Sequence, residues 1–534
     1  MNGPLVARSP RPTSGPMWSC SRRATSRVNY VITVLGVIAG LTLLTVALFQ
    51  LGGSTADTHA SREATLAAAA ALTLILWAPS LGVALHNPAA WASPLPLQAI
   101  GYTVFFLMPA VQVALDPAED YRHLLRFYPS ALALLGIGYP VLVLGYHGRL
   151  GAVLAAATRR SLPFPSYEPS SLPALAAALI MYAIGWTARL ILIQKGVFYH
   201  TAASEYYFTP AANLLGQVAW LCKLAFIVLL VRWLRYPNAG GAALGVVAVG
   251  ALEVGFGLVS GGRQIVAEVA VYSVVGYLTV RRKLPVVRWA IAIAALTLIF
   301  TMVAAYRYEL VRYRRGGTAI GAAEVLSASS RTLNAVYRDP AWFADGLKQL
   351  VRRNSDITVV AAFVRDTPSV YPFEYGRTYL GIIFFFIPRA LWPEKPSLIV
   401  GFETTQRYFP DSDPYNYASS PATLIGEFYI NFGVGGVLLG MAFWGVFLRF
   451  LYEYAQTERL AGSGYLFVYL FSSSYMVWVS QTAGVVVAIG RMWLAVFALT
   501  LLAQMLGGPA SRLDAGSPAR PALSEVRRWL SRRP

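Results

Sequence analysis

Residues 128–147 read YPSALALLGIGYPVLVLGYH, a run without Asp, Glu, Lys or Arg. As an α-helix such a run is about 30 Å long, which matches the hydrocarbon core of a bilayer. Similar runs recur along the chain, and of its 534 residues 56% are hydrophobic and only 13% charged. A soluble globular chain carries about 25% charged residues. The sequence therefore predicts a polytopic membrane protein and excludes the disordered, fibrous and disulfide-framework classes.

The predicted fold is an all-α polytopic integral membrane protein, because a helix satisfies every backbone group of a lipid-exposed segment internally. About 12 transmembrane helices are expected, nine within residues 28–306 and three within residues 421–507. Their predicted bounds are 28–51, 64–85, 93–115, 128–147, 171–193, 211–231, 240–259, 265–280, 288–306, 421–448, 464–485 and 491–507.

Arginine and lysine are distributed unevenly among the predicted loops. The tails 1–27 and 508–534 are basic, and so are the connections after the fourth, sixth and eighth predicted spans. Because cytoplasmic loops carry an excess of Lys and Arg, both termini are expected in the cytoplasm. Much of the net charge of +19 then reflects topology, and no nucleic-acid partner is expected.

Residues 307–420 interrupt the succession of spans and form a predicted large extracytoplasmic loop. A loop of this length usually has a function of its own. Within it, residues 378–392 read TYLGIIFFFIPRALW, which is strongly apolar but too short to cross the membrane and is interrupted by Pro388. This stretch predicts an interfacial or re-entrant segment lying against the bilayer.

Several arginines are expected at the outer membrane surface, where the positive-inside rule disfavours them. Arg263 stands in the turn SGGRQ between the seventh and eighth spans, and Arg307 and Arg314 follow the ninth span. The planar guanidinium fork suits a phosphate or pyrophosphate, so these residues predict an anionic ligand. Contact with lipid headgroups, or an ion pair such as Arg307 with Glu309, is the alternative.

Charged residues fall inside the fifth, sixth, seventh and eighth predicted spans, namely Arg189, Lys223, Glu253 and Glu268. A charge within the membrane normally faces a partner or a wet cavity, since its burial costs several kcal/mol. A structural pair of Lys223 with Glu253 or Glu268 explains them without a ligand. Arg189 is near the outer end of its span and could instead reach outward to the headgroups.

Residues 388–396, PRALWPEKP, hold Arg389, Trp392 and Lys395 between three prolines beside the apolar segment. Prolines restrict the backbone and can present side chains rigidly to a substrate. An interfacial anchor, with Trp and Lys at headgroup level, explains the same residues equally well.

The tenth predicted span opens with Glu427 and Asn431, which lie four residues apart and so share one helix face. A carboxylate near the outer mouth of the bundle is a candidate general base. A polar pair that packs two helices together is the alternative.

The remaining signals are weak or missing. His200 lies in a predicted outer loop and is a candidate base or sugar contact, although a lone loop histidine usually has neither role. There is no Walker loop, so an ATP-driven pump is disfavoured. The two cysteines, Cys20 and Cys222, indicate neither a disulfide framework nor a metal site.

Three stretches together resemble one family. GRTY at 376–379, IPRALWPEKP at 387–396 and IGEFYINFG at 425–433 resemble the bacterial oligosaccharide repeat-unit polymerases, also called O-antigen polymerases. The turn SGGR at 260–263 is similar to the short Gly-Arg turn of that family. The resemblance covers roughly residues 255–450, and the first half of the chain matches only in hydropathy.

The resemblance implies a GT-C-like fold and a transfer reaction that needs no metal or other cofactor. A growing glycan would pass from its undecaprenyl-pyrophosphate carrier to the next lipid-linked unit, at the outer face of the cytoplasmic (inner) membrane. Arginines would stabilise the leaving pyrophosphate. The expected catalytic residues are then Arg263, Glu427 and Arg389, and the expected substrate-binding residues are Arg307, Arg314, Arg377, Lys395, His200, Tyr375, Trp392 and Asn431.

The expected partners are the lipid-pyrophosphate-linked oligosaccharide, membrane lipids, and a chain-length regulator and flippase of the same pathway. An O-antigen ligase uses the same donor with another acceptor, and the sequence barely separates it from a polymerase. A precursor transporter or flippase is an alternative from another class, as is a scaffold without catalysis. The large outer loop and the outer arginines argue against a transporter, which usually binds its cargo at the midplane between repeats.

Overall fold

The structure is a computed structural model that describes most of the chain from Thr33 to Gly507. The described residues are 33–46, 48, 58–84, 87–116, 122–161, 171–195, 209–238, 241–260, 262–283, 286–315, 322–338, 342–353, 355–384, 392, 400–410, 422–455, 464–479 and 481–507. Within these ranges every regular element is helical and no strand occurs. The predicted all-α fold is confirmed for this part of the chain.

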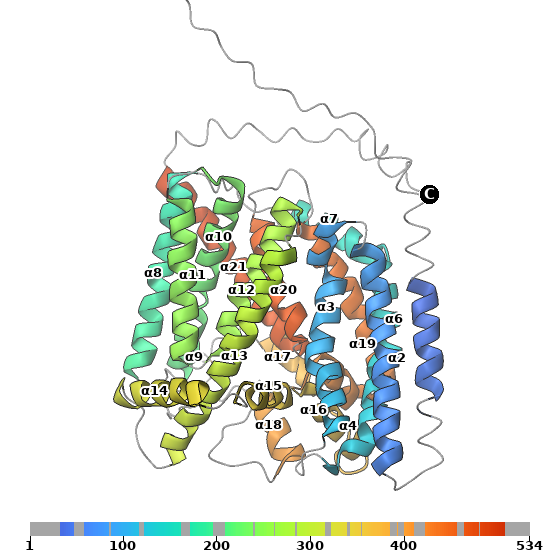
Figure 1. Ribbon diagram of the computed structural model, residues 1–534. Helices are drawn as coiled ribbons and strands as arrows, with labels where there is room; N and C mark the ends of the chain where they lie inside the picture. The colour runs from blue at the N-terminus through green and yellow to red at the C-terminus, as the bar shows by residue number, and fades with distance from the viewer. Residues whose placement is uncertain are drawn as a thin grey trace, which may run out of the picture.

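Most helices run lengthwise between the two ends of one bundle (Figure 1). The lower end in Figure 1, where α13 ends, is called the loop end below, and the upper end the opposite end. The lengthwise helices are α2 (Thr58–Ala84), α3 (Pro94–Tyr102), α4 (Met108–Leu115), α6 (Tyr128–His147), α8 (Leu172–Gln194), α9 (Pro210–Val218), α10 (Leu221–Arg235), α11 (Ala242–Val259), α12 (Arg263–Arg281), α13 (Val286–Arg315), α19 (Leu424–Ala455), α20 (Gly464–Trp478) and α21 (Thr482–Gly507). A π-helical turn, Thr103–Leu107, joins α3 to α4.

Eight of the described helices are long and apolar enough to cross a membrane. They are His59–Gly82, Pro94–Leu115, Leu125–His147, Leu172–Gln194, Pro210–Arg235, Ala242–Val259, Leu424–Ala455 and Thr482–Gly507. Two shorter apolar helices, Thr33–Val46 and Trp289–Val303, lie within the first and ninth predicted spans. The fold is therefore that of a polytopic membrane protein, while the count of 12 spans stays a prediction.

Hydroxyl side chains set the start of two lengthwise helices. The Ser171 hydroxyl accepts a hydrogen bond from the Ala174 N–H at the start of α8. The Thr209 hydroxyl accepts one from the Ala212 N–H at the start of α9. Each bond satisfies a backbone donor that has no partner within its own helix.

The contact between α6 and α19 is close because glycines let the two backbones approach each other. A Cβ atom on Gly145 would collide with the Ala442 carbonyl oxygen, and one on Gly445 would collide with that of Leu142. The fully buried Trp444 of α19 belongs to the same hydrophobic core cluster as Leu142 of α6. Small residues at such contacts are a common means of helix packing in lipid, where no hydrophobic force drives helices together.

A break divides α19 near its start. Phe432 and Gly433 have non-helical backbone angles, and the φ of Gly433 is 63°, a conformation that favours glycine. A Cβ atom on Gly440 would meet the ring of Phe428, so residues 424–431 turn back alongside the helix that follows them. We call residues 424–431 the returning helix.

The returning helix begins inside the bundle rather than at its surface. The Ile425 side chain lies beside Gly138, which is near the middle of α6. Hydropathy predicts one span over 421–448, and the structure divides this stretch at 432–433. Hydropathy does not reveal this break, because the residues on both sides of it are equally apolar.

A second break separates α20 from α21, also inside the bundle. α20 starts and α21 ends at the opposite end (Figure 1), and the break falls between Trp478 and Thr482. Val479 has a φ of 49°, which is rare for a β-branched residue, and it packs against Gly101 of α3. The predicted boundary at 486–490 is wrong, because these residues lie within α21.

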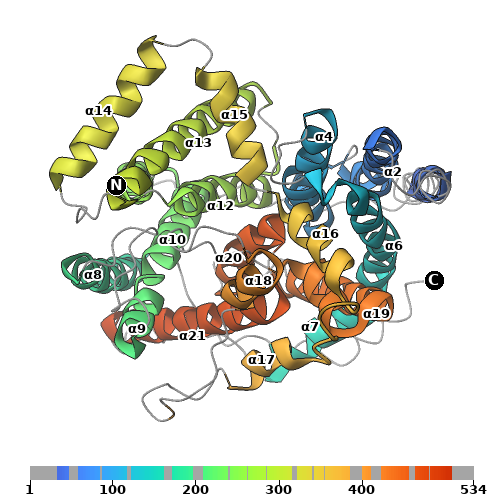
Figure 2. The same cartoon turned by 90° about the horizontal axis from the view of Figure 1, so that it is seen from below.

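Shorter helices cover the two ends of the bundle. α7 (Leu150–Ser161) lies at the opposite end, and the others lie at the loop end, which Figure 2 shows from below. The loop-end helices are α14 (Ala322–Arg338), α15 (Trp342–Arg353), α16 (Asp356–Asp366), α17 (Leu380–Phe384) and α18 (Val400–Tyr408). Part of the predicted loop 307–420 is therefore folded, and α13 itself continues nine residues past the predicted end of its span, to Arg315.

We predict that Gly445→Ala destabilises the protein, whereas Gly435→Ala in the same helix does not. The added methyl at 445 overlaps the Leu142 carbonyl oxygen, while the site at 435 has no atom within 4 Å. Overpacking costs about 1–3 kcal/mol, whereas alanine in an open helix position gains about 0.5–1 kcal/mol over glycine. Thermal unfolding in detergent tests both, and equal unfolding temperatures for the two variants would contradict the proposed close contact.

Candidate functional site

The start of the returning helix meets the break between α20 and α21 inside the bundle. The Leu424 N–H donates to the Val479 carbonyl oxygen at 3.0 Å. The Thr482 N–H, at the start of α21, donates to Glu427 Oε2 at 2.5 Å. A carboxylate at a helix N-terminus is favoured by the helix dipole. Glu427 is fully buried, so its carboxylate acts here as the cap of α21.

Asn431, one helical turn after Glu427, ties the returning helix to a distant part of the chain. Its Oδ1 accepts a hydrogen bond from the Gly376 N–H at 2.8 Å. Its Nδ2 donates to Thr378 Oγ1 at 2.8 Å and to the Glu427 carbonyl oxygen at 2.7 Å. The Asn431 side chain is also fully buried, and all its polar atoms bond within the protein.

The turn at 374–379 rests on the end of the returning helix. The last carbonyls of a helix lack partners within it, and here the Glu374 and Tyr375 N–H groups donate to the carbonyls of Ile430 and Asn431 at 2.9 and 3.2 Å. Gly376 has a φ of 90°, which requires glycine, and Arg377 follows it in a single 3₁₀ turn. The Arg377 side chain therefore extends from a turn whose backbone these hydrogen bonds hold in place.

Arg377 belongs to a network of four charged residues, which we call the Glu374 network. Arg377 Nε donates to Glu374 Oε2 at 2.5 Å, and its terminal nitrogen donates to Glu403 Oε2 at 2.8 Å. Arg407 forms a further ion pair with Glu374. Partial burial raises the pKa of the Glu374 carboxyl, but the hydrogen bonds and charges of Arg377 and Arg407 outweigh burial and hold this pKa below its ordinary value.

The two guanidinium groups of this network remain accessible. The Arg377 side chain is 48% exposed and that of Arg407 is 40% exposed, while Glu374 between them is 14% exposed. Half-exposed guanidinium groups that share one carboxylate can exchange a bond to it for a bond to a phosphate. The Glu374 network is therefore a candidate anion site at the loop end.

The sequence does not predict three members of the Glu374 network, namely Glu374, Glu403 and Arg407. Glu403 and Arg407 lie four residues apart and share one face of α18. That spacing was the available signal, but it gives no hint that the face meets the turn at 374–379. The contact follows only from the tertiary fold.

The other predicted site residues lie beside the Glu374 network, on other helices, or outside the described residues. Tyr375 is 74% exposed beside Arg377, and Trp392 contacts the ring of Phe384 at 5.2 Å between centroids. Arg263 is the first residue of α12, half-buried and on a different helix from the Glu374 network. Arg307 and Arg314 belong to the last turns of α13, whereas Arg389, Lys395 and His200 lie outside the described residues.

The charges predicted inside the spans form two buried ion pairs. Arg189 and Glu253 are joined by two bonds of 2.7 Å each. Lys223 Nζ lies 2.6 Å from Glu268 Oε2, and Gln264 Nε2 donates to Glu268 Oε1 at 2.9 Å. The predicted structural pairing is confirmed, with Glu268 as the partner of Lys223. The outward reach suggested for Arg189 is wrong, because Arg189 is only 4% exposed.

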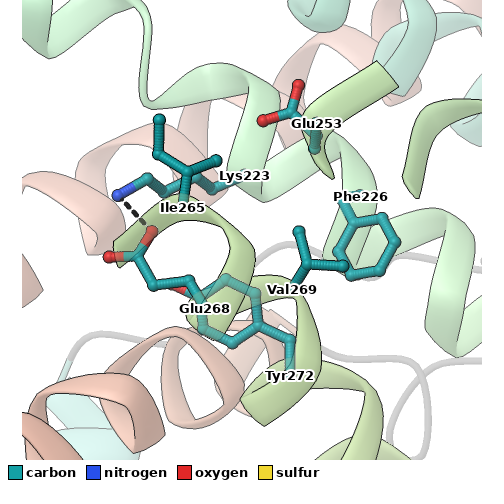
Figure 3. Close-up of a pocket in the computed structure, with 7 residues that line it drawn as sticks. All are labelled: Lys223, Phe226, Glu253, Ile265, Glu268, Val269 and Tyr272. Carbon is teal, nitrogen blue, oxygen red and sulfur yellow. Dashed lines mark ion pairs between the residues drawn. The ribbon is translucent and has the colours of Figure 1, made fainter. Parts of the chain in front are cut away.

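A small pocket lies between these pairs, and its lining is shown in Figure 3. Glu253, Lys223 and Glu268 contribute its charged wall, and Tyr272 closes one side. Each charged group already has an opposite charge in contact, so the pocket offers a ligand little uncompensated charge. Among the described residues, no group of three or more His, Cys, Asp or Glu is arranged to hold a metal ion.

A helical bundle with membrane-length apolar helices and paired charges inside it defines an integral membrane protein. A family model described as Domain of unknown function (DUF8712) matches residues 183–483, which is more than half of the chain. The chain belongs to this family. The matched region runs from α8 to the start of α21 and includes both buried ion pairs and the Glu374 network.

The chain is also similar to two curated relatives named O-antigen polymerase, from Salmonella typhimurium and Salmonella typhi. Each is 31% identical to it over 120 residues, which is 22% of this chain. The match spans only 28% of the relatives' own length. No solved structure matches the chain.

We predict that Arg189→Met strongly destabilises the protein and that Arg189→Met/Glu253→Leu recovers much of the loss. The single change leaves the Glu253 carboxylate buried without its cation, at a cost of about 3–5 kcal/mol, whereas the double change removes both charges. Thermal unfolding of both variants in lipid nanodiscs measures the difference. A double variant less stable than the single one would show that the pair does more than balance charge.

Proposed function

We propose that the protein polymerises undecaprenyl-pyrophosphate-linked oligosaccharide repeat units into a surface polysaccharide. The reaction would occur at the outer face of the cytoplasmic membrane, with the loop end outside and both termini in the cytoplasm. The observation that carries the proposal is the convergence of Arg377 and Arg407 on Glu374 at an accessible surface of the loop end. The local similarity to O-antigen polymerases supports the same substrate class.

In this reaction the acceptor hydroxyl oxygen bonds to the anomeric carbon of the growing glycan. The bond from that carbon to the lipid pyrophosphate breaks, the pyrophosphate leaves with the electron pair, and the hydroxyl proton passes to a base. Negative charge therefore grows on the pyrophosphate, and fixed guanidinium groups stabilise it. We assign this role to Arg377 and Arg407, with Arg263, Arg307, Arg314, Arg389 and Lys395 as further candidates from the sequence.

The role of Glu427 is better explained by positioning than by proton transfer. Its carboxylate is fully buried and bonded to the start of α21, and Asn431 links its helix to the turn that carries Arg377. Glu403 is 42% exposed and bonded to Arg377. When a phosphate binds the Arg377 guanidinium in place of Glu403, the Glu403 carboxylate would become free to accept the proton of the acceptor hydroxyl. We therefore propose Glu403 as the base and Glu427 and Asn431 as positioning residues.

The aromatic and loop residues complete the proposed substrate site. Tyr375 and Trp392 would stack on sugar rings, and His200 is a further sugar contact proposed from the sequence. The apolar helices would hold the lipid tail. No metal or nucleotide takes part in the proposed step, and a chain-length regulator and flippase of the same pathway are the proposed partners.

A transporter of the same lipid-linked units is the second candidate function. The observation that favours it is the meeting of two broken helices inside the bundle, because transporters build midplane sites from such breaks. A ligase would share the proposed site with a polymerase and differ in its acceptor.

We predict that Arg377→Ala and Arg407→Ala each lower polymer formation by about 100-fold or more, as expected on removal of a group that stabilises developing charge. Arg377→Lys is expected to restore little, because an ammonium cannot form the paired contacts of a guanidinium. The assay uses the purified protein in liposomes with lipid-pyrophosphate-linked repeat units, without added metal or nucleotide, and is read as a glycan ladder on a gel.

Arg122→Ala is the matched control, since Arg122 is another exposed arginine and lies in the connection from α4 to α6. Its ladder should equal that of the wild type. Full-length ladders from the Arg377 and Arg407 variants would remove the Glu374 network from the site. Movement of the lipid-linked units across the liposome membrane, with no ladder, would favour the transporter.

We predict that Glu427→Gln keeps polymer formation within about tenfold of the wild type, whereas loss of a general base costs 10²–10⁴-fold. Glutamine retains an oxygen that can accept the Thr482 N–H, so the cap of α21 survives. Glu427→Ala removes this oxygen and should lower both activity and the unfolding temperature. A Gln variant that unfolds like the wild type but forms no ladder would instead identify Glu427 as the base.

A further inference from the structure

α14 and α15 lie where lengthwise helices reach the loop-end surface of the bundle. Gly346 of α15 packs against Thr301, which is in the last turn of the apolar stretch Trp289–Val303 of α13. Gln112 Nε2, in the last turn of α4, donates to the Lys348 carbonyl oxygen at 3.0 Å. The end of α4 and the end of the apolar stretch of α13 therefore both lie at the level of α15.

Both short helices lie across the direction of the bundle rather than along it. Figure 1 shows them crosswise at the loop end, and Figure 2 shows them on either side of α13 at the edge of the molecule. α14 is tied to the continuation of α13, because Arg331 lies 3.9 Å from Glu309. A crosswise helix at the depth where spans end has the placement of an interfacial helix.

α14 has three distinct faces. Ala328 and Thr332 are buried. Leu333 is 57% exposed and forms the apolar outer face of the helix. Arg331 is two residues before Leu333 and therefore on nearly the opposite side of the helix, where it is exposed.

Charge complements the apolar face of this pair. Arg331, Arg338 and Lys348 are all exposed on α14 and α15. Residues 322–353 also contain Arg352 and Arg353, against Glu324, Asp339 and Asp345, so their net charge is positive. Basic residues near a membrane surface attract anionic headgroups, and long cationic side chains reach them from an interfacial helix.

We propose that α14 and α15 form a lipid-binding interfacial pair at the loop end. The Leu333 face of α14 enters the acyl-chain region, and Arg331, Arg338 and Lys348 bind the phosphates of anionic phospholipids. α14 and α15 belong to the predicted extracytoplasmic loop 307–420 and would lie in the membrane surface. They are separate from the segment 378–392. The proposal does not depend on the proposed polymerase activity.

The test places an environment-sensitive fluorophore on Leu333→Cys in the full-length protein, with Asn334→Cys as the matched control. Cys20→Ser removes the tail thiol, and Cys222 is fully buried. The samples are nanodiscs of phosphatidylglycerol with phosphatidylcholine and nanodiscs of phosphatidylcholine alone. We expect the label at 333 to emit at shorter wavelength and to be quenched by lipids with a nitroxide on the acyl chain. The label at 334 should be quenched by iodide in water.

The charge component is tested in the same protein with Arg331→Gln/Arg338→Gln/Lys348→Gln. This variant should hold fewer motionally restricted spin-labelled phosphatidylglycerol molecules than the wild type, while Asn334→Gln should not differ from it. Iodide quenching of the label at 333 would overturn the interfacial placement. Equal retention of phosphatidylglycerol by the triple variant would overturn the role of the cations. Neither readout needs enzymatic activity, so failure of the polymerase proposal would leave both unchanged.

Discussion

The bond from the first N–H of α21 to the Glu427 carboxylate is the contact on which the arrangement of the candidate site depends. A backbone group without a partner is costly inside a membrane, so a chain can break a helix there only where a neighbour supplies the missing bonds. Here the start of the returning helix and the break between α20 and α21 supply them to each other, through Glu427 and through the Leu424 N–H and Val479 carbonyl. These bonds hold the returning helix in place. Its carbonyls at 430 and 431 accept hydrogen bonds from the turn that carries Arg377.

The charged residues of the protein divide according to their access to water. Arg189 and Glu253 are both nearly inaccessible and each satisfies the other, because an unpaired charge in this environment would change its protonation or unfold its surroundings. Arg377 and Arg407 share one carboxylate and keep much of their surface exposed. Only the second arrangement leaves guanidinium groups that a ligand can reach, which is why the proposed chemistry lies at the loop end and not between the buried pairs.

Particular residues show how far sequence reasoning reaches in this protein. The spacing of Glu427 and Asn431 predicts a shared helix face, and both do engage the same neighbourhood. The sequence does not predict that both side chains are fully buried, because their burial depends on the folding back of residues 424–431 at Phe432 and Gly433. Arg407 was missed because its partner, Glu374, is far away in the sequence and neither residue stands in a recognisable motif. Lys223 had two acidic candidates at suitable depth, and only the packing of α10 against α12 selected Glu268.

The sequence by itself determined that the chain is a helical membrane protein, since the thickness of a bilayer and the need to satisfy the backbone leave long apolar runs no other regular structure. It also pointed to the stretches 376–379 and 425–433 as parts of one site. The tertiary structure alone decided where helices break, which charges pair, and that α14 and α15 lie across the loop end. These features depend on contacts between residues far apart along the chain, and local composition and hydropathy do not encode such contacts.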